Sequence, residues 1–398
     1  MRPPLSKSDA HRALVLADIL GVPFEEVLPA GEELPRDVEV LRDGLIALRN
    51  PTARIDCQDG GAPFRFLLTQ AAVLPGRRVE FTGTGRLGER PHGPLIAALR
   101  SIPGVKITEG NPWPVIVASP RVLAGSLVFR VSGSESSQFA SSLLLGAARL
   151  AASQIVAGVL IEGPMTSSGY FELTRAWLVR CGFVVEGSPL TPTLLPLEAR
   201  VRRSPLRRER GTIPGDWSSL GYLLALSWVS GQPVERIVFG TGHPDEAIAS
   251  HLRSVGLRIS DRVEGIATRG FEVDAEQCPD AIPTLAVLAT KLPSPSTFCK
   301  VGILRHKESD RVEAILSLLS AAGLPASLAD DTLTVMPGTA RAFRFDAHDD
   351  HRLAMSAAVL ARLHGVQLTL RGKDCVAKSF PGFWLEAAQA GVTVEAWE

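Results

Sequence analysis

Residues 215–231 read GDWSSLGYLLALSWVSG, which is a polar start followed by an apolar run of helical length. The run from Trp217 to Gly231 is hydrophobic nearly all round, and this pattern is typical of a helix buried in a core. The first turn of a helix presents free N–H groups and the positive end of a dipole, so it is a ready site for anions. The stretch therefore predicts a buried helix that begins at a polar, anion-tolerant position.

The same pattern occurs six times along the chain. The apolar segments are His11–Gly21, Arg65–Gly76, Ser136–Leu150, Trp217–Gly231, Asp280–Pro293 and His351–Gly365. The polar groups at their starts read SKSDAHR, DGGAPFR, SESSQ, GDWSS, PD and DDHR. Several helix starts with added Lys and Arg would suit a small, heavily charged substrate.

A second, more amphipathic kind of helix alternates with the buried ones, ends at glycine and leads into a short β-like run. The copies are Leu95–Arg100, Leu173–Arg180, Ile248–Val255, Val312–Ala322 and Leu385–Ala390, with a weaker first copy at Leu41–Asn50. The glycines fit the position just past a helix C-terminus. The repeat of roughly 55–80 residues exceeds the usual solenoid periods, so we expect six folding units in an α/β (α+β) protein.

The length of 398 residues predicts two domains, and three units in each place the boundary near Thr212–Gly215. We therefore expect domains at residues 1–213 and 214–398. The boundary follows VRRSPLRRERG at positions 201–211, a basic stretch that could be a nucleic-acid patch. It lacks interleaved aromatic residues, and the chain carries 42 basic and 42 acidic residues, so we interpret it as a solvated strand or linker and expect no nucleic-acid partner.

Composition also argues against membranes, disulfides and metals. The most apolar stretch, Phe139–Gly163, is interrupted by charged and polar residues, and the N-terminus has no apolar signal region. Five scattered cysteines without CxxC spacing indicate reduced thiols in a cytoplasmic protein. His348 and His351 are the closest metal-ligand candidates, but the adjacent Arg352 would repel a cation. We expect no metal and no cofactor.

Lysine is rare, since it makes up only seven of the 42 basic residues. Lys7, Lys307 and Lys378 nevertheless stand inside motif-like runs, which favours a need for a compact ammonium group there. With only seven lysines, their positions in these runs could also have arisen by chance, and this alternative stays open.

Several polar runs carry candidate chemistry. Residues 4–12, PLSKSDAHR, place a lysine, a serine and an arginine at one helix start, where they can hold a phosphate or carboxylate. Further candidates are Arg90 in GERP, Ser136-Ser137-Gln138, and Ser167 with Tyr170 in TSSGY. Each of these alone is also typical of an ordinary N-cap or surface turn.

Two runs are harder to explain as surface features. HKESDR at 306–311 has four ionised groups in its last five residues, and DDHR at 349–352 is followed by an isolated lysine in CVAKSFPGFW at 375–384. These charges precede apolar helices rather than follow a polar helix face. Acids and cations opposed in one cleft would tune a carboxylate for proton transfer while binding anionic ligands.

Together these motifs resemble the 5-enolpyruvylshikimate-3-phosphate synthase family, the 3-phosphoshikimate 1-carboxyvinyltransferases. SKSxxxRAL, RFL, ERP, SSQF, SxxY, GDxSS, PD, KExDR, DDHRxAM and CxxKxFPxFW appear in the family's order from Leu5 to the C-terminus. The resemblance implies two similar domains of three βαβαββ-like units, an inside-out barrel, closing like a clamp. It also implies a monomer that transfers the enolpyruvyl group of phosphoenolpyruvate to the 5-hydroxyl of shikimate 3-phosphate and releases phosphate.

The resemblance implies a role for each matching residue. Shikimate 3-phosphate would contact Lys7, Ser8, Arg12, Ser136, Ser137, Gln138, Ser167, Tyr170, Asp280 and Lys307. Phosphoenolpyruvate would contact Lys7, Gly61, Arg90, Gln138, Arg311, His351, Arg352 and Lys378. Asp280 would receive the 5-hydroxyl proton with help from Lys307, Glu308 would protonate the enol methylene carbon, and Lys7 would lie between the substrates. Acid and base act in opposite senses in the addition and elimination halves, so paired carboxylates suit this chemistry.

Three departures from the family pattern bear on these expectations. The loop Gln58–Pro63 reads QDGGAP, with Asp59 in place of an asparagine and Ala62 in place of a threonine, and this should weaken phosphoenolpyruvate binding and alter the response to glyphosate. Ile303 replaces a polar residue found in some members. The first motif begins at the chain start, where members usually have an upstream strand, so we expect a lost strand or a misassigned start codon.

Two alternatives remain at this point. One is a catalytically weakened paralogue that binds phosphorylated small molecules, suggested by the altered glycine loop. The retained Asp280, Lys307 and Glu308 argue against it, because binding alone needs no proton-transfer acids. The other is UDP-N-acetylglucosamine enolpyruvyl transferase, which is disfavoured because SKSxxxR, KExDR and DDHR match the shikimate enzyme.

Overall fold

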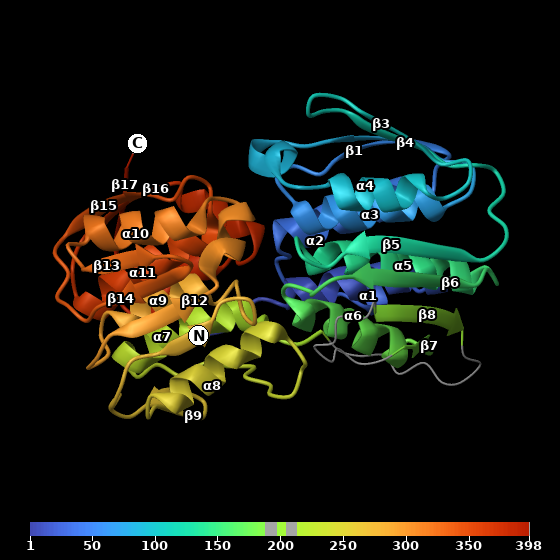
Figure 1. Cartoon of the computed structure of the whole chain (residues 1–398). Helices are drawn as coiled ribbons and strands as arrows, with labels where there is room; N and C mark the ends of the chain where they lie inside the picture. The colour runs from blue at the N-terminus through green and yellow to red at the C-terminus, as the bar shows by residue number, and fades with distance from the viewer. Residues whose placement is uncertain (188–196, 204–212, 398) are drawn as a thin grey trace. The chain divides into compact units, whose positions relative to one another are not determined.

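The computed structural model describes residues 1–187, 197–203 and 213–397, and the chain forms two compact units (Figure 1). The N-terminal unit contains Lys7–Glu32 and Asp37–Ile213, and the C-terminal unit contains Met1–Ser6, Glu33–Arg36 and Pro214–Glu398. The last boundary between the units falls after Ile213, and two short N-terminal segments belong with the C-terminal unit. Positions 204–212, with most of the basic stretch and Thr212, lie outside the described residues.

Long-range backbone bonds explain why the first six residues join the C-terminal unit. The Met1 amino group donates to the Pro233 carbonyl at 2.6 Å, and Ser6 N–H donates to the Pro214 carbonyl at 2.8 Å. Leu5 also forms an isolated antiparallel bridge with Gly215. These pairings join residues more than 200 positions apart, which no local sequence pattern could indicate.

The described residues of the N-terminal unit, which leave out 188–196 and 204–212, form six helices, two 3-10 turns and two four-stranded sheets. The helical elements are α1 (Lys7–Leu20), η1 (Phe24–Glu26), α2 (Arg36–Ala47), α3 (Gly61–Val73), η2 (Gly85–Glu89), α4 (Gly93–Arg100), α5 (Ser137–Ala152) and α6 (Ser168–Arg180). The strands are β1 (Thr52–Asp56), β2 (Arg78–Thr82), β3 (Lys106–Glu109), β4 (Val115–Ala118), β5 (Leu127–Ser132), β6 (Ala157–Glu162), β7 (Phe183–Glu186) and β8 (Leu197–Arg203).

The two sheets of this unit have the same topology, in the orders β1-β2-β4-β3 and β5-β6-β8-β7. The first pair of strands in each is parallel, with Ile55 opposite Phe81 and Val131 opposite Ile161, and the remaining pairs are antiparallel. A parallel pair needs a crossover, which α3 and α5 supply. Each sheet with its two helices is therefore one βαβαββ unit, the order that the family resemblance implies. The first repeat of this unit contains the helix pair α1 and α2.

The C-terminal unit is built on the same plan. Its helical elements are α7 (Trp217–Ser230), η3 (Pro244–Glu246), α8 (Ala247–Ser254), α9 (Ile282–Ala289), η4 (Val301–His306), α10 (Arg311–Ala321), α11 (His351–His364), η5 (Lys373–Lys378) and α12 (Phe383–Gln389). Its strands are β9 (Arg258–Ile259), β10 (Val263–Glu264), β11 (Glu272–Asp274), β12 (Ser296–Cys299), β13 (Ala326–Ala329), β14 (Thr332–Val335), β15 (Phe343–Asp346), β16 (Leu368–Arg371) and β17 (Val394–Ala396).

One full βαβαββ unit in this half has the order β11-β12-β14-β13, with β11 and β12 parallel across α9. The last repeat forms the parallel sheet β15-β16-β17, and the first forms the hairpin of β9 and β10 beside α7 and α8. Six repeats are therefore present, and three of them carry the complete strand set.

The core of each unit is helical, with sheets on the outside (Figure 1). All but one residue of α3 is buried, as are twelve of the fourteen residues of α11, whereas β1 and β3 are mostly exposed. The six predicted buried helices are all present. The first two begin four residues earlier than predicted, at Lys7 and Gly61, so their polar motifs occupy the first turns rather than precede them.

Close packing of α3 against α5 depends on Gly146. An added Cβ on Gly146 would lie 2.6 Å from the Thr69 methyl carbon, which is closer than carbon atoms approach. We expect Gly146→Ala to lower the free energy of unfolding by about 1–3 kcal/mol, measured by urea denaturation. Gly93→Ala at the start of α4 is the matched control, because nothing lies within 4 Å of its added Cβ. Equal stability of the two variants would contradict this packing.

Candidate active site

The predicted substrate residues of the N-terminal unit gather at the starts of its helices. Lys7 is the first residue of α1, and its ammonium lies 3.0 Å from an Asp37 carboxylate oxygen. The Lys7 side chain is 16% exposed and that of Asp37 is 5% exposed, so the ammonium is held at the edge of the core. His11, one turn further along α1, has Nε2 at 3.2 Å from the Asp37 backbone carbonyl.

Arg12 forms three hydrogen bonds with residues of α1 and α6. Its Nε donates to the Thr174 hydroxyl at 2.8 Å, and its two terminal nitrogens donate to the Ser8 and Tyr170 carbonyls, each at 2.7 Å. Burial lowers the pKa of Arg12 to about 10, although the Asp9 charge acts in the opposite direction. Arg12 remains protonated at neutral pH, so it holds α1 against α6 as a fixed cation.

Arg65 links α3 to α5 in a similar way. It is buried, donates to the Gln138 side-chain oxygen at 2.6 Å and to the Pro91 carbonyl at 3.0 Å, and stacks over the Phe139 ring. Burial, together with the Arg65 charge, lowers the pKa of His92 to about 3, so this imidazole is neutral. Its hydrogen bond to Gln138 means that Arg65 holds the side-chain amide of this predicted substrate residue in place.

The glycine loop brings Arg90 close to the α3 N-terminus. An added Cβ on Gly61 would lie 2.5 Å from an Arg90 guanidinium nitrogen, so a side chain at position 61 would displace this cation. Helix N–H groups and a guanidinium at one place form a suitable anion site.

The remaining serine candidates lie at the starts of α5 and α6. Ser136 is the N-cap of α5 and accepts from Gln138 N–H at 3.3 Å, and the adjacent Ser137 is buried. Ser167 precedes α6 with a left-handed φ of 53°, and Tyr170 lies in the first turn. The Tyr170 carbonyl, which accepts from Arg12, joins this group to the α1 start.

The C-terminal unit holds a second cluster, centred on Asp280 just before α9. One Asp280 carboxylate oxygen lies 2.8 Å from Arg311 and 3.4 Å from Lys307, and the other lies 2.9 Å from Arg352. Burial raises the pKa of Asp280, but the charges of Arg352, Lys307 and Arg311 outweigh it and hold the pKa well below the usual range. Asp280 is therefore ionised at neutral pH.

Arg311, the first residue of α10, connects three carboxylates although its side chain is only 1% exposed. Besides Asp280 it contacts Glu308 at 2.7 Å and the fully buried Asp350 at 2.8 Å. The other Glu308 oxygen lies 3.5 Å from the Lys378 ammonium, which is also buried. Burial lowers the pKa of Arg311, but the three carboxylates together raise it above its ordinary value.

Asp350 organises the start of α11. It is the N-cap, it accepts from Arg352 N–H at 3.0 Å, and the Ser309 hydroxyl donates to it at 2.8 Å. His351 and Arg352 follow in the first turn, and both are buried. The Arg352 carbonyl accepts the Tyr222 hydroxyl at 3.3 Å, which ties this turn to α7.

Each unit therefore gathers its own share of the predicted site residues. The N-terminal cluster contains Lys7, Ser8, Arg12, Gly61, Arg90, Ser136, Ser137, Gln138, Ser167 and Tyr170. The C-terminal cluster contains Asp280, Lys307, Glu308, Arg311, His351, Arg352 and Lys378. It sets four Lys and Arg cations against three carboxylates once Asp350 is included. This arrangement can bind anions and present carboxylates for proton transfer.

Sequence reasoning missed three residues that hold these clusters together. Asp37 lies in the first turn of α2, ahead of the predicted helix start at Leu41, and carries no motif signal, whereas Arg65 and Asp350 stand inside motifs that were assigned to their neighbours. Arg65 and Asp350 could have been found from the sequence, because each is a charged residue at the start of a predicted buried helix. Among the described residues, no group of three His, Cys, Asp or Glu side chains could hold a metal ion.

The fold and the two clusters define an enolpyruvyl transferase. A family model described as EPSP synthase (3-phosphoshikimate 1-carboxyvinyltransferase) matches residues 31–386. The chain belongs to this family of transferases. The predicted family, fold class and enzyme class are thereby confirmed.

Individual relatives agree with this membership. A 3-phosphoshikimate 1-carboxyvinyltransferase of Methanopyrus kandleri is 32% identical and covers 98% of this chain and 95% of its own, and one of Methanoculleus marisnigri is 33% identical with coverages of 96% and 88%. EPSP synthase from Acinetobacter baumannii superposes with a TM-score of 0.71 at 18% identity, covering 100% of this chain and 97% of its own. The enolpyruvyl transferase NikO from Streptomyces tendae gives 0.64 at 14% identity, with coverages of 99% and 94%. These two structures share the fold.

The buried histidines of the N-terminal unit predict a pH-dependent stability. Burial lowers the pKa of His11 from 6.5 to about 3, with Asp37 acting in the opposite direction. Between these values the unfolded chain binds a proton that the folded chain does not, so the free energy of unfolding falls as pH falls from about 6.5. We expect His11→Asn to reduce this dependence by up to about 1.4 kcal/mol per pH unit, measured by urea unfolding from pH 7 to pH 4.5.

His348→Asn is the matched control for this measurement. The His348 side chain is 74% exposed and its left-handed backbone suits asparagine. It should keep the wild-type slope. A His11→Asn slope equal to that of His348→Asn would show that folding does not lower the pKa of His11.

Proposed function

We propose that this protein transfers the enolpyruvyl group of phosphoenolpyruvate to the 5-hydroxyl of shikimate 3-phosphate, giving 5-enolpyruvylshikimate 3-phosphate and phosphate. The observation that carries the proposal is the Asp280–Arg311–Glu308 arrangement, in which one arginine holds two candidate proton-transfer carboxylates. Membership of the EPSP synthase family supplies the reaction class. Relatives about 30% identical over nearly the whole chain are named 3-phosphoshikimate 1-carboxyvinyltransferase.

The addition half of the reaction needs a base on oxygen and an acid on carbon. The 5-hydroxyl oxygen forms a bond to C2 of phosphoenolpyruvate while its proton passes to the Asp280 carboxylate, which the surrounding cations keep ionised. Glu308 donates a proton to the methylene carbon C3. The product is a tetrahedral adduct that still carries the phosphate.

The elimination half reverses the roles of the same groups. C3 returns its proton to Glu308, its C–H electron pair forms the C2=C3 double bond, and the C2–O bond to phosphate breaks. The phosphate departs with the electron pair of that bond and takes the proton held by Asp280, so both carboxyl groups return to their starting states. Glu308 contacts Arg311 and Lys378 in the free protein. An anionic ligand that takes over these two cations would free Glu308 to carry the proton that it donates.

We assign shikimate 3-phosphate to the N-terminal cluster, with Asp280 and Lys307 contacting it near the reacting hydroxyl. Ser136, Ser137 and Ser167 provide hydroxyl donors for its phosphate, and these serines stand at two helix starts. Arg12 and Ser8 face its carboxylate, with Lys7 between the two substrates, while Tyr170 and Gln138 complete the contacts. Three hydrogen bonds hold the Arg12 guanidinium in place, and its positive charge at this fixed position suits a carboxylate.

We assign the phosphoenolpyruvate carboxylate to Arg311, Arg352 and His351, and its phosphate to Arg90 and Lys378 beside Gly61, with Lys7 and Gln138 also in contact. The close approach of Arg90 to Gly61 supports a phosphate site there. We further propose that the enzyme is a cytoplasmic monomer. Five free cysteines are compatible with a reducing compartment, and no described helix is both long and apolar enough to cross a bilayer.

Phosphate release tests the proposed function directly. The purified protein should release phosphate when phosphoenolpyruvate and shikimate 3-phosphate are both present and not with either alone. Asp280→Ala should lower kcat by about 10²–10⁴-fold, because it removes the base, while shikimate 3-phosphate still binds in a calorimetric titration. Asp261→Ala, at a carboxylate that is exposed and contacts only its sequence neighbours, is the matched control and should match wild type.

The outcomes separate the possible errors. No phosphate release by wild type, with shikimate 3-phosphate still binding, would favour a non-catalytic phospho-ligand binder. Wild-type turnover by Asp280→Ala would remove Asp280 from the mechanism and leave the overall reaction in place.

A further inference from the structure

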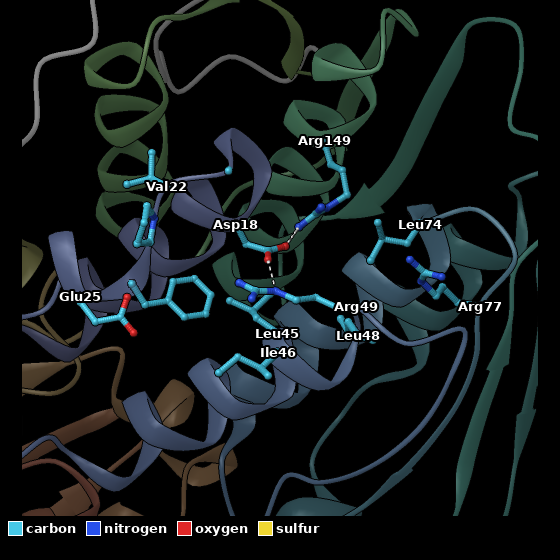
Figure 2. A pocket seen from close by; sticks show the side chains of 13 residues that line it. Asp18, Val22, Glu25, Leu45, Ile46, Leu48, Arg49, Leu74, Arg77 and Arg149 are labelled. Carbon is cyan, nitrogen blue, oxygen red and sulfur yellow. Dashed lines mark hydrogen bonds and ion pairs between the residues drawn. The ribbon is translucent and has the colours of Figure 1, made fainter.

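The N-terminal unit contains a cavity of about 570 Å³ at the far ends of its helices (Figure 2). It is lined by residues at or just beyond the C-termini of four helices, namely Asp18 and Val22 for α1, Leu48 and Arg49 for α2, Leu74 for α3, and Arg149 for α5. The proposed substrate residues stand at the opposite ends, where Lys7, Gly61 and Ser137 begin α1, α3 and α5. The cavity is therefore separate from the proposed active site, and its volume is typical of small-molecule sites.

Three arginines line this cavity around a single nearby carboxylate. Arg149 lies 2.5 Å from one Asp18 oxygen, and Arg49 lies 3.7 Å from the other, so both oxygens of Asp18 are already engaged. Within the described part of the chain, the guanidinium of Arg77 has no ion pair, and its buried Nε has no hydrogen-bond partner. Glu25, the second acid of the lining, is exposed and lies across the cavity from Arg77 (Figure 2).

Helix capping accounts for two of these arginines and leaves Arg77 unexplained. A cation near a helix C-terminus is favourable, which suits Arg49 after α2 and Arg149 in the last turn of α5. At the end of α3, however, the Leu74 carbonyl already accepts the Ser119 hydroxyl at 2.5 Å. Ser119 also accepts from Arg77 N–H at 2.8 Å, so the backbone that carries Arg77 is fixed without help from its guanidinium.

The positive charge at this end of the cavity is in excess. Burial lowers the pKa of Arg149, the Asp18 charge raises it, and the Arg77 charge lowers it further. Arg149 and Arg77 repel each other. The nearby acid Asp18 is already engaged by Arg149 and Arg49. An additional anion beside Arg77 and Arg149 is therefore favoured.

An apolar surface adjoins the cationic end. Leu45 and Leu48 are almost completely buried in the cavity wall, and Phe24 is 5% exposed. The Arg49 guanidinium stacks over the Phe24 ring at 5.4 Å. A ligand with one anionic end and a flat apolar body matches both parts of the lining.

We propose that this cavity is a binding site for a small organic oxyanion, a carboxylate or phosphate on an apolar body about one ring in size. The oxyanion contacts Arg77 and Arg149, and the ring lies against Phe24 and Leu48. The recognised chemistry is the oxyanion, and the two sources, carboxylate and phosphate, are distinguished by the probes below.

Calorimetric titrations with benzoate and with phenyl phosphate test the site. At least one should bind with a Kd on the order of 1 mM, as expected for so small a ligand, and the tighter of the two identifies the anion class. The neutral benzyl alcohol should bind at least about tenfold more weakly, since it lacks the charge. Arg77→Gln should weaken binding of the tighter probe by about tenfold or more, whereas Arg78→Gln, at the exposed adjacent residue outside the cavity, should bind as wild type does.

Two further variants locate the bound probe and keep the test independent of the proposed catalytic function. Ile46→Trp should fill the cavity and reduce binding without changing charge, because Ile46 lines the cavity and is 44% exposed, while Ile266→Trp in the C-terminal unit is the control. Arg12→Gln, in the proposed substrate cluster, should leave probe affinity unchanged. Absence of saturable binding by both anions, equal affinity of Arg77→Gln and Arg78→Gln, or loss of binding in Arg12→Gln would each overturn the proposal.

Discussion

The central contact of the C-terminal unit joins the buried guanidinium of Arg311 to three carboxylates. A cation that is 1% exposed is costly to desolvate, and only direct partners on several sides can offset that cost. Asp280 precedes α9, Arg311 begins α10 and Asp350 caps α11, so this one side chain fixes three helix starts together. Removing one member would leave an uncompensated buried charge, at a cost of about 3–5 kcal/mol. Stability and the placement of the proposed acid and base therefore have the same origin.

The N-terminal unit applies the same principle with single arginines. Arg12 ties α1 to α6, and Arg65 ties α3 to α5, in each case through bonds at the starts of the helices. Helix N-termini are already positive, so cations placed beside them favour an anion at the same position. The Lys7 ammonium of this cluster contacts the Asp37 carboxylate at 3.0 Å.

The helical core could be predicted from sequence because its signal is local. Each of the six buried helices follows from an apolar run behind a polar start, whereas the βαβαββ order of the strands was expected only from the family resemblance. Two features had no local signal. The first six residues join the C-terminal unit through pairing with residues around 214 and 233, and Asp37 contacts Lys7 across 30 positions from the first turn of α2, ahead of the predicted helix start at Leu41. The starts of α1 and α3 were misplaced by four residues, because polar groups can occupy a first turn as readily as precede it.

The central claim is that the cationic clusters of the two units serve the two substrates of one reaction. Steady-state kinetics with each substrate varied separately tests it most directly in Arg12→Gln and Arg352→Gln, one variant from each unit. The account predicts that Arg12→Gln raises KM for shikimate 3-phosphate by about tenfold or more and affects phosphoenolpyruvate less, while Arg352→Gln does the reverse. Wild-type constants in either variant, or the same substrate affected in both, would contradict it.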